Sequence, residues 1–358
     1  MKIFVINPGG GSTKLGYFEN EKEIFIEKVY HSPEELKKFD TIEKELEYRK
    51  KLVENFIEKK GIDFEVIVSR GGAFMPLESG TYLITEKLVK DVLEGKVQAQ
   101  HPSNFGVLIA WEIAKKRKIE AYFVDPVCVD EFIDEARISG IPELERKSLL
   151  HALNVRYVSH LLAKEIGKDF NELNLVVAHL GTGITIAAIR KGRIIDVNNA
   201  NDGGPFSPQR AGTLPTTGLI KLCFSGKFTE KQLIKYVTKQ AGLLAYLGKD
   251  MITEIEKDIE KGDKKADLIY RAMIYQIAKE IGAYATALKG KVDYIVITGG
   301  MAISNKLVEK LKEYINYIAP IKVYPGEHEM EALVAGVLRV KRGEEKPKKY
   351  EEVFKEIT

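Results

Sequence analysis

Two glycine-rich turns hold the residues of this chain that are best suited to chemistry: NPGGGSTK at residues 7–14 and HLGTG at residues 179–183. Each turn joins an apolar segment to an alternating one, so each is expected to connect the two strands of a hairpin. Three successive residues without a Cβ atom allow backbone N–H groups and hydroxyls to approach an anion closely. The two turns therefore predict phosphate binding, and together they could hold one polyphosphate.

The first turn differs from a Walker A loop. It lacks Gly-Lys-Ser/Thr, and the residues after it alternate as a strand, whereas a Walker A loop begins a helix. Plain turn chemistry is the alternative for either turn, but the polar side chains around the glycines and the second copy favour phosphate. The candidate phosphate ligands are Asn7, Gly10, Ser12, Lys14, Gly181, Thr182 and Gly183.

A third glycine pair, Gly299-Gly300, lies where the apolar segment YIVITGG meets the next predicted helix. Glycines there allow close backbone approach, and a helix N-terminus favours an anion or a nucleotide. An ordinary strand-to-helix turn is the alternative. The loop DGGPFSPQRAG at residues 202–212 is long, polar and rich in glycine and proline. Such a loop inside a compact domain usually has a binding function.

Ionisable side chains follow several of the predicted strands. Asp125 ends an apolar strand and precedes a proline, a position that often faces a crevice, so it is predicted to be a catalytic or metal-binding carboxylate. An arginine after a strand is often only a surface ion pair, and isolated histidines such as His31, His160 and His328 are more often structural. The other candidates are Arg70, His101, His151, His179, Arg210, Glu329 and Glu331.

The hydrophobic periodicity predicts the order βββαβα in both halves of the chain. In the first half, strands are expected over 2–19 as a hairpin, 25–30, 64–70 and 121–127, and helices over 32–61, 86–94 and 104–118. In the second half, strands are expected over 174–190 as a hairpin, 193–199, 293–300 and 321–326, and helices within 215–289, over 305–316 and from 328. Apolar strands between amphipathic helices predict mixed sheets covered by helices.

The repeat predicts an α/β protein of two similar domains with the ligand between them. The first domain is expected over residues 1–145 and 331–358, with the C-terminal helix packed back on it, and the second over 146–330 with added helices. A length of 358 residues agrees with two domains of about 150 residues each. The segment 137–166 is expected to cross between the domains, and the charged residues 343–358 are expected to form a solvated tail.

Composition and charge exclude several other classes of protein. The 55 Lys and Arg residues against 52 Asp and Glu give a formal net charge of +3, so no strong basic stripe indicates nucleic acid. Cys128 and Cys223 lack metal-ligand spacing and are expected to be reduced. The N-terminus shows no signal-peptide pattern, and no window of about 18 residues is wholly apolar, which predicts a cytoplasmic protein without membrane spans.

The motifs together resemble those of the acetate and butyrate kinase family, within the actin, Hsp70 and sugar kinase superfamily. NPGGGSTK is similar to that family's N-terminal phosphate loop, AHLGTG to its second loop and TGG to its adenosine-side loop. QHPSN and VDP are similar to its catalytic stretches, and SRGGAF, NANDGGPFSPQRAG and PGEHEMEAL resemble its butyrate kinases more than its acetate kinases. The resemblance implies two actin-like (ribonuclease H-like) domains with a nucleotide cleft between them, the second domain being the nucleotide-binding side.

The resemblance also implies roles for single residues. Arg70 would bind the substrate carboxylate or the transferring phosphoryl group. Asp125 would hold Mg²⁺, directly or through water, with Glu331 as a second metal candidate; Glu329 is its alternative, because the alignment there is ambiguous by two residues. The implied catalytic residues are Arg70, His101, Asp125, His179 and Arg210.

Two departures from the family pattern affect this site. Acetate kinases carry a second catalytic arginine in a segment corresponding to AGTLPTTGL, where this chain has none, and Arg210 lies nearby as a substitute. The family's paired-histidine segment corresponds to LLHALNVRYV, which keeps His151 but has Val155 at the second position. Phe74 and Phe206 are the expected wall residues of an acid pocket.

The resemblance implies a reversible reaction in which ATP and butyrate, or a related short-chain acid, give ADP and an acyl phosphate, with Mg²⁺ as cofactor. Isobutyrate, other branched acids and acetate stay open as substrates, because one methylene in an apolar pocket is worth only about 1–3 kcal/mol. An actin-like or Hsp70-like ATPase that serves as a binding module and a sugar kinase are alternatives of other classes. A homo-oligomer, a dimer or larger, is implied, with neither nucleic acid nor a membrane as partner.

Overall fold

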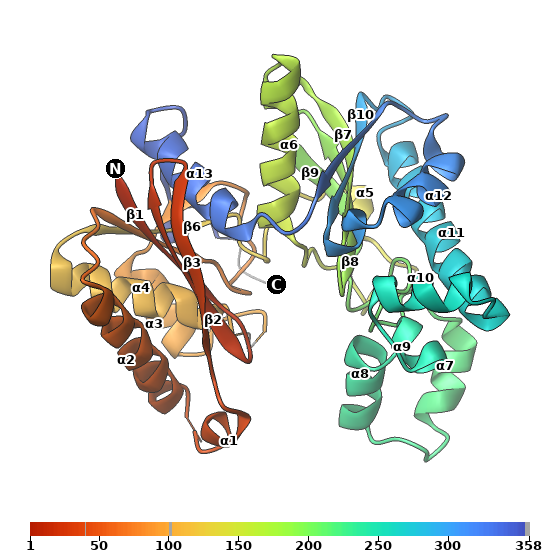
Figure 1. Cartoon of the computed structure of the whole chain (residues 1–358), viewed down its shortest axis with the longest axis horizontal. Coiled ribbons are helices and arrows are strands. Elements are labelled where there is room, and N and C mark those ends of the chain that lie inside the picture. The colour runs from red at the N-terminus through yellow and green to blue at the C-terminus, as the bar shows by residue number, and fades with distance from the viewer. Residues whose placement is uncertain (40, 100–101, 355–358) are drawn as a thin grey trace. The chain divides into compact units, whose positions relative to one another are not determined.

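The computed structural model describes residues 1–39, 41–99 and 102–354, and its contacts divide the chain into two compact units. The first contains Met1–Asp130, Ala152–Tyr157 and the residues from His328 onward, and the second contains Glu131–His151 and Val158–Glu327. Figure 1 labels most of the elements of both. Grouping by contacts does not test the predicted domain limits, 1–145 with 331–358 and 146–330, so these stay a prediction.

The sheet of the first unit has seven strands in the order β12-β5-β6-β4-β1-β2-β3. Strands β1, β2 and β3 form an antiparallel meander, β4 runs parallel to β1, and β6 runs parallel to β4. The predicted mixed sheet is thus confirmed, and the carboxyl ends of β1, β4 and β6 meet at one edge. The strands are β1 (Lys2–Pro8), β2 (Ser12–Glu19), β3 (Lys22–Tyr30), β4 (Val66–Arg70), β5 (Thr81–Leu83), β6 (Glu120–Val124) and β12 (Lys348–Lys349).

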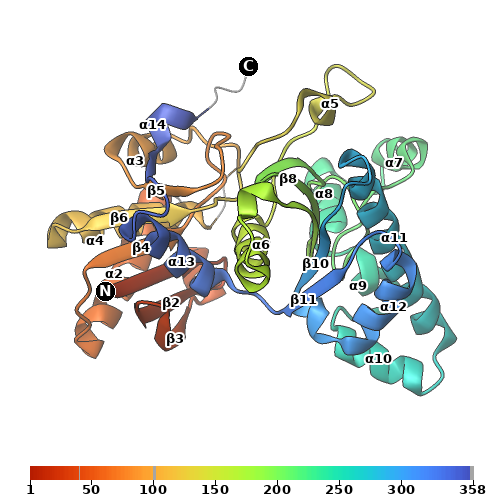
Figure 2. The same ribbon diagram turned by 90° about the horizontal axis from the view of Figure 1, so that it is seen from above.

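Helices cover both faces of this sheet (Figures 1 and 2). Because side chains alternate along a strand, Phe4 and Ile6 of β1 enter a core with α2 and α4, while Ile3 and Val5 enter a second core with α13. Burial on both faces explains why β1 is apolar throughout. The helices are α1 (Pro33–Leu36), α2 (Ile42–Lys60), α3 (Glu86–Leu93), α4 (Asn104–Arg117), α13 (Glu329–Lys341) and α14 (Tyr350–Val353).

Two expectations for this unit are wrong in detail. The helix expected over 32–61 is divided in two: α1 ends at Leu36, and the Thr41 side chain caps a new helix, α2, by accepting a backbone N–H group of its first turn. The charged tail is not simply solvated. Lys348–Lys349 extends the sheet by pairing with β5, and Tyr350 is wholly buried.

The sheet of the second unit has five strands in the order β11-β10-β7-β8-β9. Strands β7, β8 and β9 again form an antiparallel meander, while β10 runs parallel to β7 and β11 runs parallel to β10. The second mixed sheet is therefore confirmed as well. The strands are β7 (Asn174–Leu180), β8 (Ile184–Arg190), β9 (Arg193–Val197), β10 (Tyr294–Gly299) and β11 (Ile321–Pro325).

Helix α11 (Lys264–Ala287) is the centre of the second unit's core. Ile274 and Ile277 of α11 pack with Val176 and Ala178 of β7, and α6 lies on the opposite face of the sheet (Figures 1 and 2). By contacts, α6 begins in the first unit and ends in the second. The other helices are α5 (Asp134–Arg137), α6 (Ala152–Ile166), η1 (Phe170–Glu172), α7 (Thr216–Cys223), α8 (Glu230–Lys239), α9 (Gly242–Leu247), α10 (Ile252–Glu260), η2 (Gly300–Ile303) and α12 (Asn305–Ile315).

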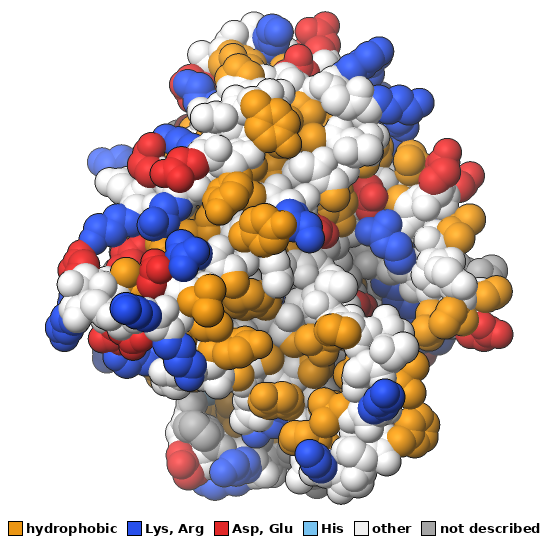
Figure 3. Space-filling view, turned by 90° about the vertical axis from the view of Figure 1, so that its right-hand side faces the viewer, with side chains coloured by type: hydrophobic (Ala, Val, Ile, Leu, Met, Phe, Trp, Pro, Cys, Tyr) orange, Lys and Arg blue, Asp and Glu red, His pale blue; other side chains and the backbone are white. Residues whose placement is uncertain are grey.

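One face of the second unit carries exposed hydrophobic side chains among charged ones (Figure 3). Tyr275 of α11 and Tyr314 of α12 are about half exposed, with ring centroids 6.0 Å apart, and Tyr317 is 80% exposed. Exposed apolar surface of this kind often contacts other proteins, and the predicted homo-oligomer stays a prediction. Among the described residues, no helix combines the length and the apolar character needed to cross a bilayer.

Candidate functional site

The carboxyl ends of β1 and β4 bring Asn7 and Arg70 to one edge of the first sheet. Strand β1 pairs with β4 with Ile6 opposite Ser69, and it pairs with β2 with Asn7 opposite Lys14. Three polar side chains that the sequence placed in the candidate site thus lie at neighbouring positions. The carboxyl edge of parallel strands is where open α/β sheets present their functional groups.

These three side chains converge on the carboxylate of Glu329, the first residue of α13. Asn7 Nδ2 donates to Glu329 Oε2 at 2.6 Å, Arg70 Nη1 lies 2.6 Å from Glu329 Oε1, and Lys14 Nζ lies 3.8 Å from Oε2. The start of a helix adds positive potential at the same point. The first unit therefore presents a partly exposed cluster of two cations, an amide and one carboxylate.

The structure distinguishes the two carboxylates that the sequence left open for a metal. Glu329 belongs to the cluster. Glu331 follows two residues later, about 200° further around the helix, and its charge acts on Tyr157, whose pKa is raised by burial and then by Glu331. Glu331, named first from the sequence, is therefore less suited to the cluster than its alternative, Glu329.

The tip of the first glycine-rich turn borders open space. A Cβ atom added to Gly11 would meet nothing within 4 Å, and φ of Gly11 lies outside the left-handed region. Neither packing nor backbone conformation thus requires glycine there, and the absence of a Cβ atom leaves room for a ligand to approach the backbone closely. Gly10 shares the turn, and Ser12 begins β2 opposite Tyr30. This geometry supports the predicted phosphate contact.

Asp125 follows β6 at the same edge, but protein groups hold its carboxylate. Oδ1 accepts the Gly80 N–H group at 2.7 Å and lies 3.0 Å from Arg156 Nε. Burial raises the pKa of Asp125 to about 6, although Arg156 and then Arg339 act in the opposite direction. Glu329 is likewise held by cations, but its side chain is 15% exposed whereas Asp125 is 4% exposed, so burial is the reason to expect a metal contact of Asp125 through water. The role of Asp125 stays a prediction. His101 lies outside the described residues.

Two histidines lie beside the second glycine-rich turn, in the second unit. His179, near the end of β7, is 4% exposed and stacks on His151 with ring centroids 4.3 Å apart. His151 Nδ1 lies 2.8 Å from Thr185 Oγ1 of β8. The hydroxyl fixes the orientation of the His151 ring, and the stack fixes that of His179. The retained histidine of the family pair is thus a direct neighbour of the predicted catalytic His179.

Arg210 lies over the second turn. A Cβ atom on Gly183 would lie 2.6 Å from Arg210 Nη1, so a larger residue there would require the guanidinium to move. Ser207 Oγ donates to the Thr182 carbonyl and accepts the Arg210 N–H group at 3.1 Å, which ties the loop to the turn. Burial lowers the pKa of Arg210, and its Nε has no hydrogen-bond partner in the described part of the chain. Arg210 as a whole is partly exposed, so this guanidinium is compatible with an anion ligand, and its role stays a prediction.

The third glycine pair lies beside the second turn because β10 runs parallel to β7. Gly299 has φ of +95°, and a Cβ atom there would lie 2.4 Å from the Leu180 carbonyl oxygen, so both conformation and close approach require glycine. Gly300, which begins η2, has nothing within 4 Å of its Cβ position. The second unit thus gathers the second turn, Arg210 and an open glycine.

Comparison with known proteins agrees with these features. The matching family model is described as the Acetokinase family and covers residues 143–322. A probable butyrate kinase of Clostridium botulinum (strain Eklund 17B / Type B) is 46% identical over 98% of this chain and 99% of that protein. Butyrate kinase 2 of Clostridium acetobutylicum is also 46% identical, with the same coverage. The chain belongs to the acetokinase family.

Solved structures share the fold of this chain. Porphyromonas gingivalis acetate kinase aligns with a TM-score of 0.75 at 21% identity, over 94% of this chain and 98% of that one. Entamoeba histolytica acetate kinase aligns with a TM-score of 0.75 at 18% identity, with the same coverage. The predicted α/β fold with two helix-covered mixed sheets, and the predicted family, are confirmed.

The two phenylalanines predicted to line an acid pocket are both buried. Phe74 is wholly buried in the first unit, and its ring packs edge-to-face on Phe123 with centroids 5.5 Å apart, so the structure gives a ligand contact no support. Phe206 is 8% exposed and belongs to the core of the second unit. Its wall role stays a prediction.

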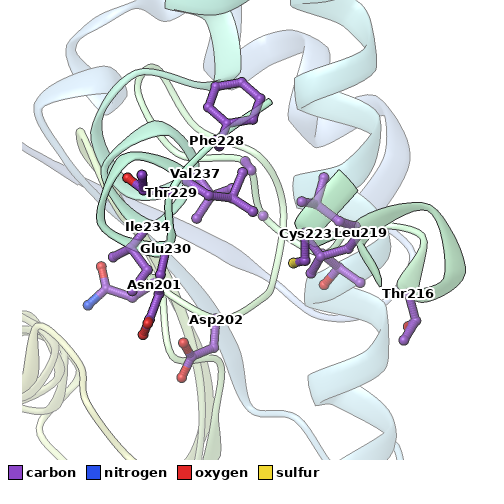
Figure 4. A pocket seen from close by; sticks show the side chains of 15 residues that line it. Asn201, Asp202, Thr216, Leu219, Cys223, Phe228, Thr229, Glu230, Ile234 and Val237 are labelled. Carbon is purple, nitrogen blue, oxygen red and sulfur yellow. The ribbon is translucent and has the colours of Figure 1, made fainter. Parts of the chain in front are cut away.

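A separate cavity of about 560 Å³ lies between α7 and α8 (Figure 4). Leu219 and Cys223 of α7 face Ile234 and Val237 of α8 across it, and both ends of the loop 202–212 contribute to its wall. None of the predicted site residues that the structure describes lines this cavity. It is therefore distinct from the phosphate-binding candidates.

The described residues include no group of three or more His, Cys, Asp or Glu side chains that could hold a metal ion. Mg²⁺ is commonly held by one or two carboxylates together with substrate phosphate oxygens and water, so it does not need such a group. The Glu329 carboxylate and the Asn7 amide supply oxygen atoms of the right chemistry at an open turn. The residues present therefore fit a Mg²⁺ ion that arrives with a nucleotide.

Sequence reasoning missed Arg49 of α2, which contacts the first turn. Arg49 is in phase with Val53 and Ile57, four and eight residues later, on the buried face of the helix, and it is 1% exposed. A charged residue in an apolar stripe is rarely buried without a partner. The spacing of Arg49 with Val53 and Ile57 could therefore have identified Arg49 from the sequence.

Proposed function

We propose that this member of the acetokinase family is a butyrate kinase, which transfers the γ-phosphoryl group of ATP to butyrate or a related short-chain acid and gives ADP and an acyl phosphate. The observation that carries the proposal is the cluster of Asn7, Lys14 and Arg70 beside an open glycine-rich turn. Relatives that are named butyrate kinases and are 46–47% identical over 98% of the chain support the choice of acid.

The chemistry fits the side chains of the first unit. A carboxylic acid is already ionised at neutral pH, so the nucleophile needs no general base. The difficulty is the repulsion between a carboxylate and a triphosphate, which positive side chains and backbone N–H groups offset in a loose transition state. We assign Arg70 to the acid or to the phosphoryl group in transfer, and Lys14 to the phosphate. Both cations already lie at the edge of the sheet where the open turn ends.

The second unit supplies a matching set of groups for the nucleotide. The second turn and Arg210 are assigned to phosphate, and Gly299 and Gly300 to close approach of the nucleoside. His179, held by its stack on His151, is assigned to the border of the transferring group. Arg210 also takes the place of the second catalytic arginine that the acetate kinases carry elsewhere.

Mg²⁺, when bound, would neutralise part of the phosphate charge, and we assign Glu329 to it in preference to Glu331. Asn7, which donates to Glu329, orients this carboxylate. Asp125, held by Arg156 and the Gly80 N–H group, is assigned a contact through water. A homo-oligomeric state and a cytoplasmic location are further parts of the proposal.

Trapping of the acyl phosphate by hydroxylamine tests the proposal. Purified protein with ATP, Mg²⁺ and butyrate should form butyryl hydroxamate, and glucose in place of butyrate should yield no sugar phosphate. ADP release without hydroxamate would favour an ATPase that serves as a binding module. Faster turnover with acetate or isobutyrate than with butyrate would support a carboxylate kinase but would show that butyrate is not the preferred acid.

A further inference from the structure

Arg49 is buried directly behind the first glycine-rich turn. Its guanidinium reaches the main chain of the turn twice: Nη1 donates to the Gly9 carbonyl at 3.1 Å, and Nη2 donates to the Gly10 carbonyl at 3.3 Å. Only 1% of the residue is exposed. A fully buried arginine that binds two successive carbonyl groups holds two successive peptide planes.

The orientation of those planes determines where the turn presents its N–H groups. A trans peptide unit is planar, and its N–H bond points away from its C=O bond. The carbonyl of Gly9 shares a plane with the N–H group of Gly10, and the carbonyl of Gly10 with that of Gly11. Because Arg49 draws both carbonyls inward, both N–H groups face the opposite side. Within the described residues, neither N–H group has a hydrogen-bond partner.

The carbonyl group of the next residue, Gly11, is also bound by the protein. The His31 N–H group donates to the Gly11 carbonyl at 2.9 Å, and the His31 ring lies 2.9 Å from Thr13 Oγ1. Three successive carbonyls of the turn are therefore bound from the protein side. The turn also borders open space, since a Cβ atom on Gly11 would meet nothing within 4 Å.

The surroundings of Arg49 suit an arginine and no other cation. Glu45, one turn earlier on α2, accepts from Arg49 Nε at 2.8 Å and lies 2.7 Å from Nη2, so the buried charge is balanced. The Phe105 ring lies 5.1 Å from the guanidinium carbon and supports its flat face. A lysine has one compact donor group and cannot bind two carbonyls and a carboxylate in the same geometry.

We propose that Arg49 is a positioning residue for phosphate binding: it acts through the main chain of the turn, holding the Gly10 and Gly11 N–H groups toward the nucleotide phosphate, without touching the ligand itself. The inference rests on the proposed function, because it requires the first turn to bind a nucleotide. It assigns the nucleotide affinity of the turn to a helix residue that is about forty positions away in the sequence.

The test compares Arg49→Lys with a matched control, Arg117→Lys. Arg117 also lies on a helix of the first unit and also covers a phenylalanine ring, that of Phe64, at 4.4 Å, but it is exposed, and none of the contacts seen among the described residues joins it to the turn. Calorimetry gives the Kd for ADP, and steady-state kinetics give KM for ATP and for butyrate. Circular dichroism confirms folding at the assay temperature.

Arg49→Lys should weaken ADP binding and raise KM for ATP by about tenfold or more, as expected for the loss of one or two hydrogen bonds to an anion. KM for butyrate should change by less than about threefold, a split that general loosening of the fold would not produce. Arg117→Lys should match the wild type in all three values. Equal ADP affinity in wild type and Arg49→Lys would overturn the inference while leaving the proposed function intact.

A second variant keeps the test decisive if Arg49→Lys does not fold. Arg49→Met combined with Glu45→Leu replaces the buried ion pair with apolar side chains, a change that proteins often tolerate. It should fold and show the same selective loss of nucleotide affinity, whereas unchanged affinity would overturn the inference. Failure of the wild type itself to bind ADP would instead refute the proposed function.

Discussion

Glu329 allows cations to collect at the strand ends before any ligand is present. Arg70 and Lys14 would repel each other across one edge of a sheet, and the carboxylate between them offsets that repulsion. An incoming phosphate or carboxylate can take over part of these contacts without a large movement of the side chains. The cluster is therefore preorganised for anions while remaining partly exposed.

Arg70 is the residue at which loss of catalysis should exceed loss of binding. We expect Arg70→Ala to lower kcat by about a hundredfold or more, a size typical of removing one donor to a transition state, with little change in the Kd for ADP. Stopped assays of acyl hydroxamate and ADP calorimetry measure the two effects. Arg271→Ala, at an exposed helical ion pair with Asp267, is the control and should behave as the wild type. Near-normal turnover of Arg70→Ala would show that Arg70 does not bind the acid or the phosphoryl group during transfer.

The pair Glu329 and Glu331 gives a sharp test of the metal assignment. Glu329→Gln should raise the Mg²⁺ concentration needed for half-maximal rate by about tenfold or more, because an amide is a weaker ligand than a carboxylate. Glu331→Gln, two residues away on the same helix, should leave that concentration unchanged. Magnesium titrations of the initial rate measure both. A larger increase in that Mg²⁺ concentration for Glu331→Gln than for Glu329→Gln would instead indicate Glu331 as the metal ligand.

At the scale of elements, each glycine-rich turn has its own support. The first turn is held from behind by Arg49 and the backbone of His31, while the second lies beside paired imidazoles and under Arg210. The two turns look alike in sequence, but their buried partners differ. Turn geometry in this fold is thus determined by residues that are distant along the chain.

Gly11 should matter to the ligand and not to the fold. Gly11→Ala removes no native contact and introduces no backbone strain, so the melting temperature should stay within about 2 °C of wild type. The Kd for ADP should rise by about tenfold or more, because a methyl group occupies the space beside the turn. Gly282→Ala, within helix α11 and equally open, should stabilise by up to about 1 kcal/mol without changing ADP affinity. A Gly11→Ala protein with normal ADP affinity would contradict the phosphate assignment.

His31 should make stability depend on pH. Burial, and then Arg49, lower the pKa of His31 to about 4, so below pH 6.5 the unfolded chain binds a proton that the folded protein does not. The stability that the neutral ring contributes is present above pH 6.5 and is lost as pH falls toward 4, to an extent of about 3 kcal/mol. Urea unfolding of wild type and His31→Gln at pH 7 and pH 4.5 measures this. Equal losses in the two proteins would show that His31 is not the source.

The elements themselves were largely predictable from the sequence, because apolar periodicity is local. Both mixed sheets and the three glycine-rich turns lie where the pattern indicated. The division of the helix over 32–61 and the pairing of Lys348–Lys349 with β5 were not predictable, since they depend on partners far along the chain. The same reason applies to Glu329, which is distinguished from Glu331 only by what each side chain meets in the folded unit.

At the scale of the whole molecule, two units share one element order and use it differently. In each unit, the next strand after the three-stranded meander leads to two successive glycines. Strand β4 leads to Arg70-Gly71-Gly72, and β10 leads to Thr298-Gly299-Gly300. The first unit thus offers a charged side chain where the second offers bare backbone. The proposed roles, catalytic cations in the first unit and nucleotide contact in the second, rest on this difference.

In the proposed reaction, a carboxylate oxygen of butyrate attacks the γ-phosphorus of ATP. The most direct measurement supplies butyrate labelled with ¹⁸O at both oxygens, together with ATP and Mg²⁺, and follows the products by ³¹P NMR and mass spectrometry. We expect one butyryl phosphate for each ADP, with both labelled oxygens retained and one of them bridging carbon and phosphorus. ADP accompanied only by unlabelled inorganic phosphate would contradict it.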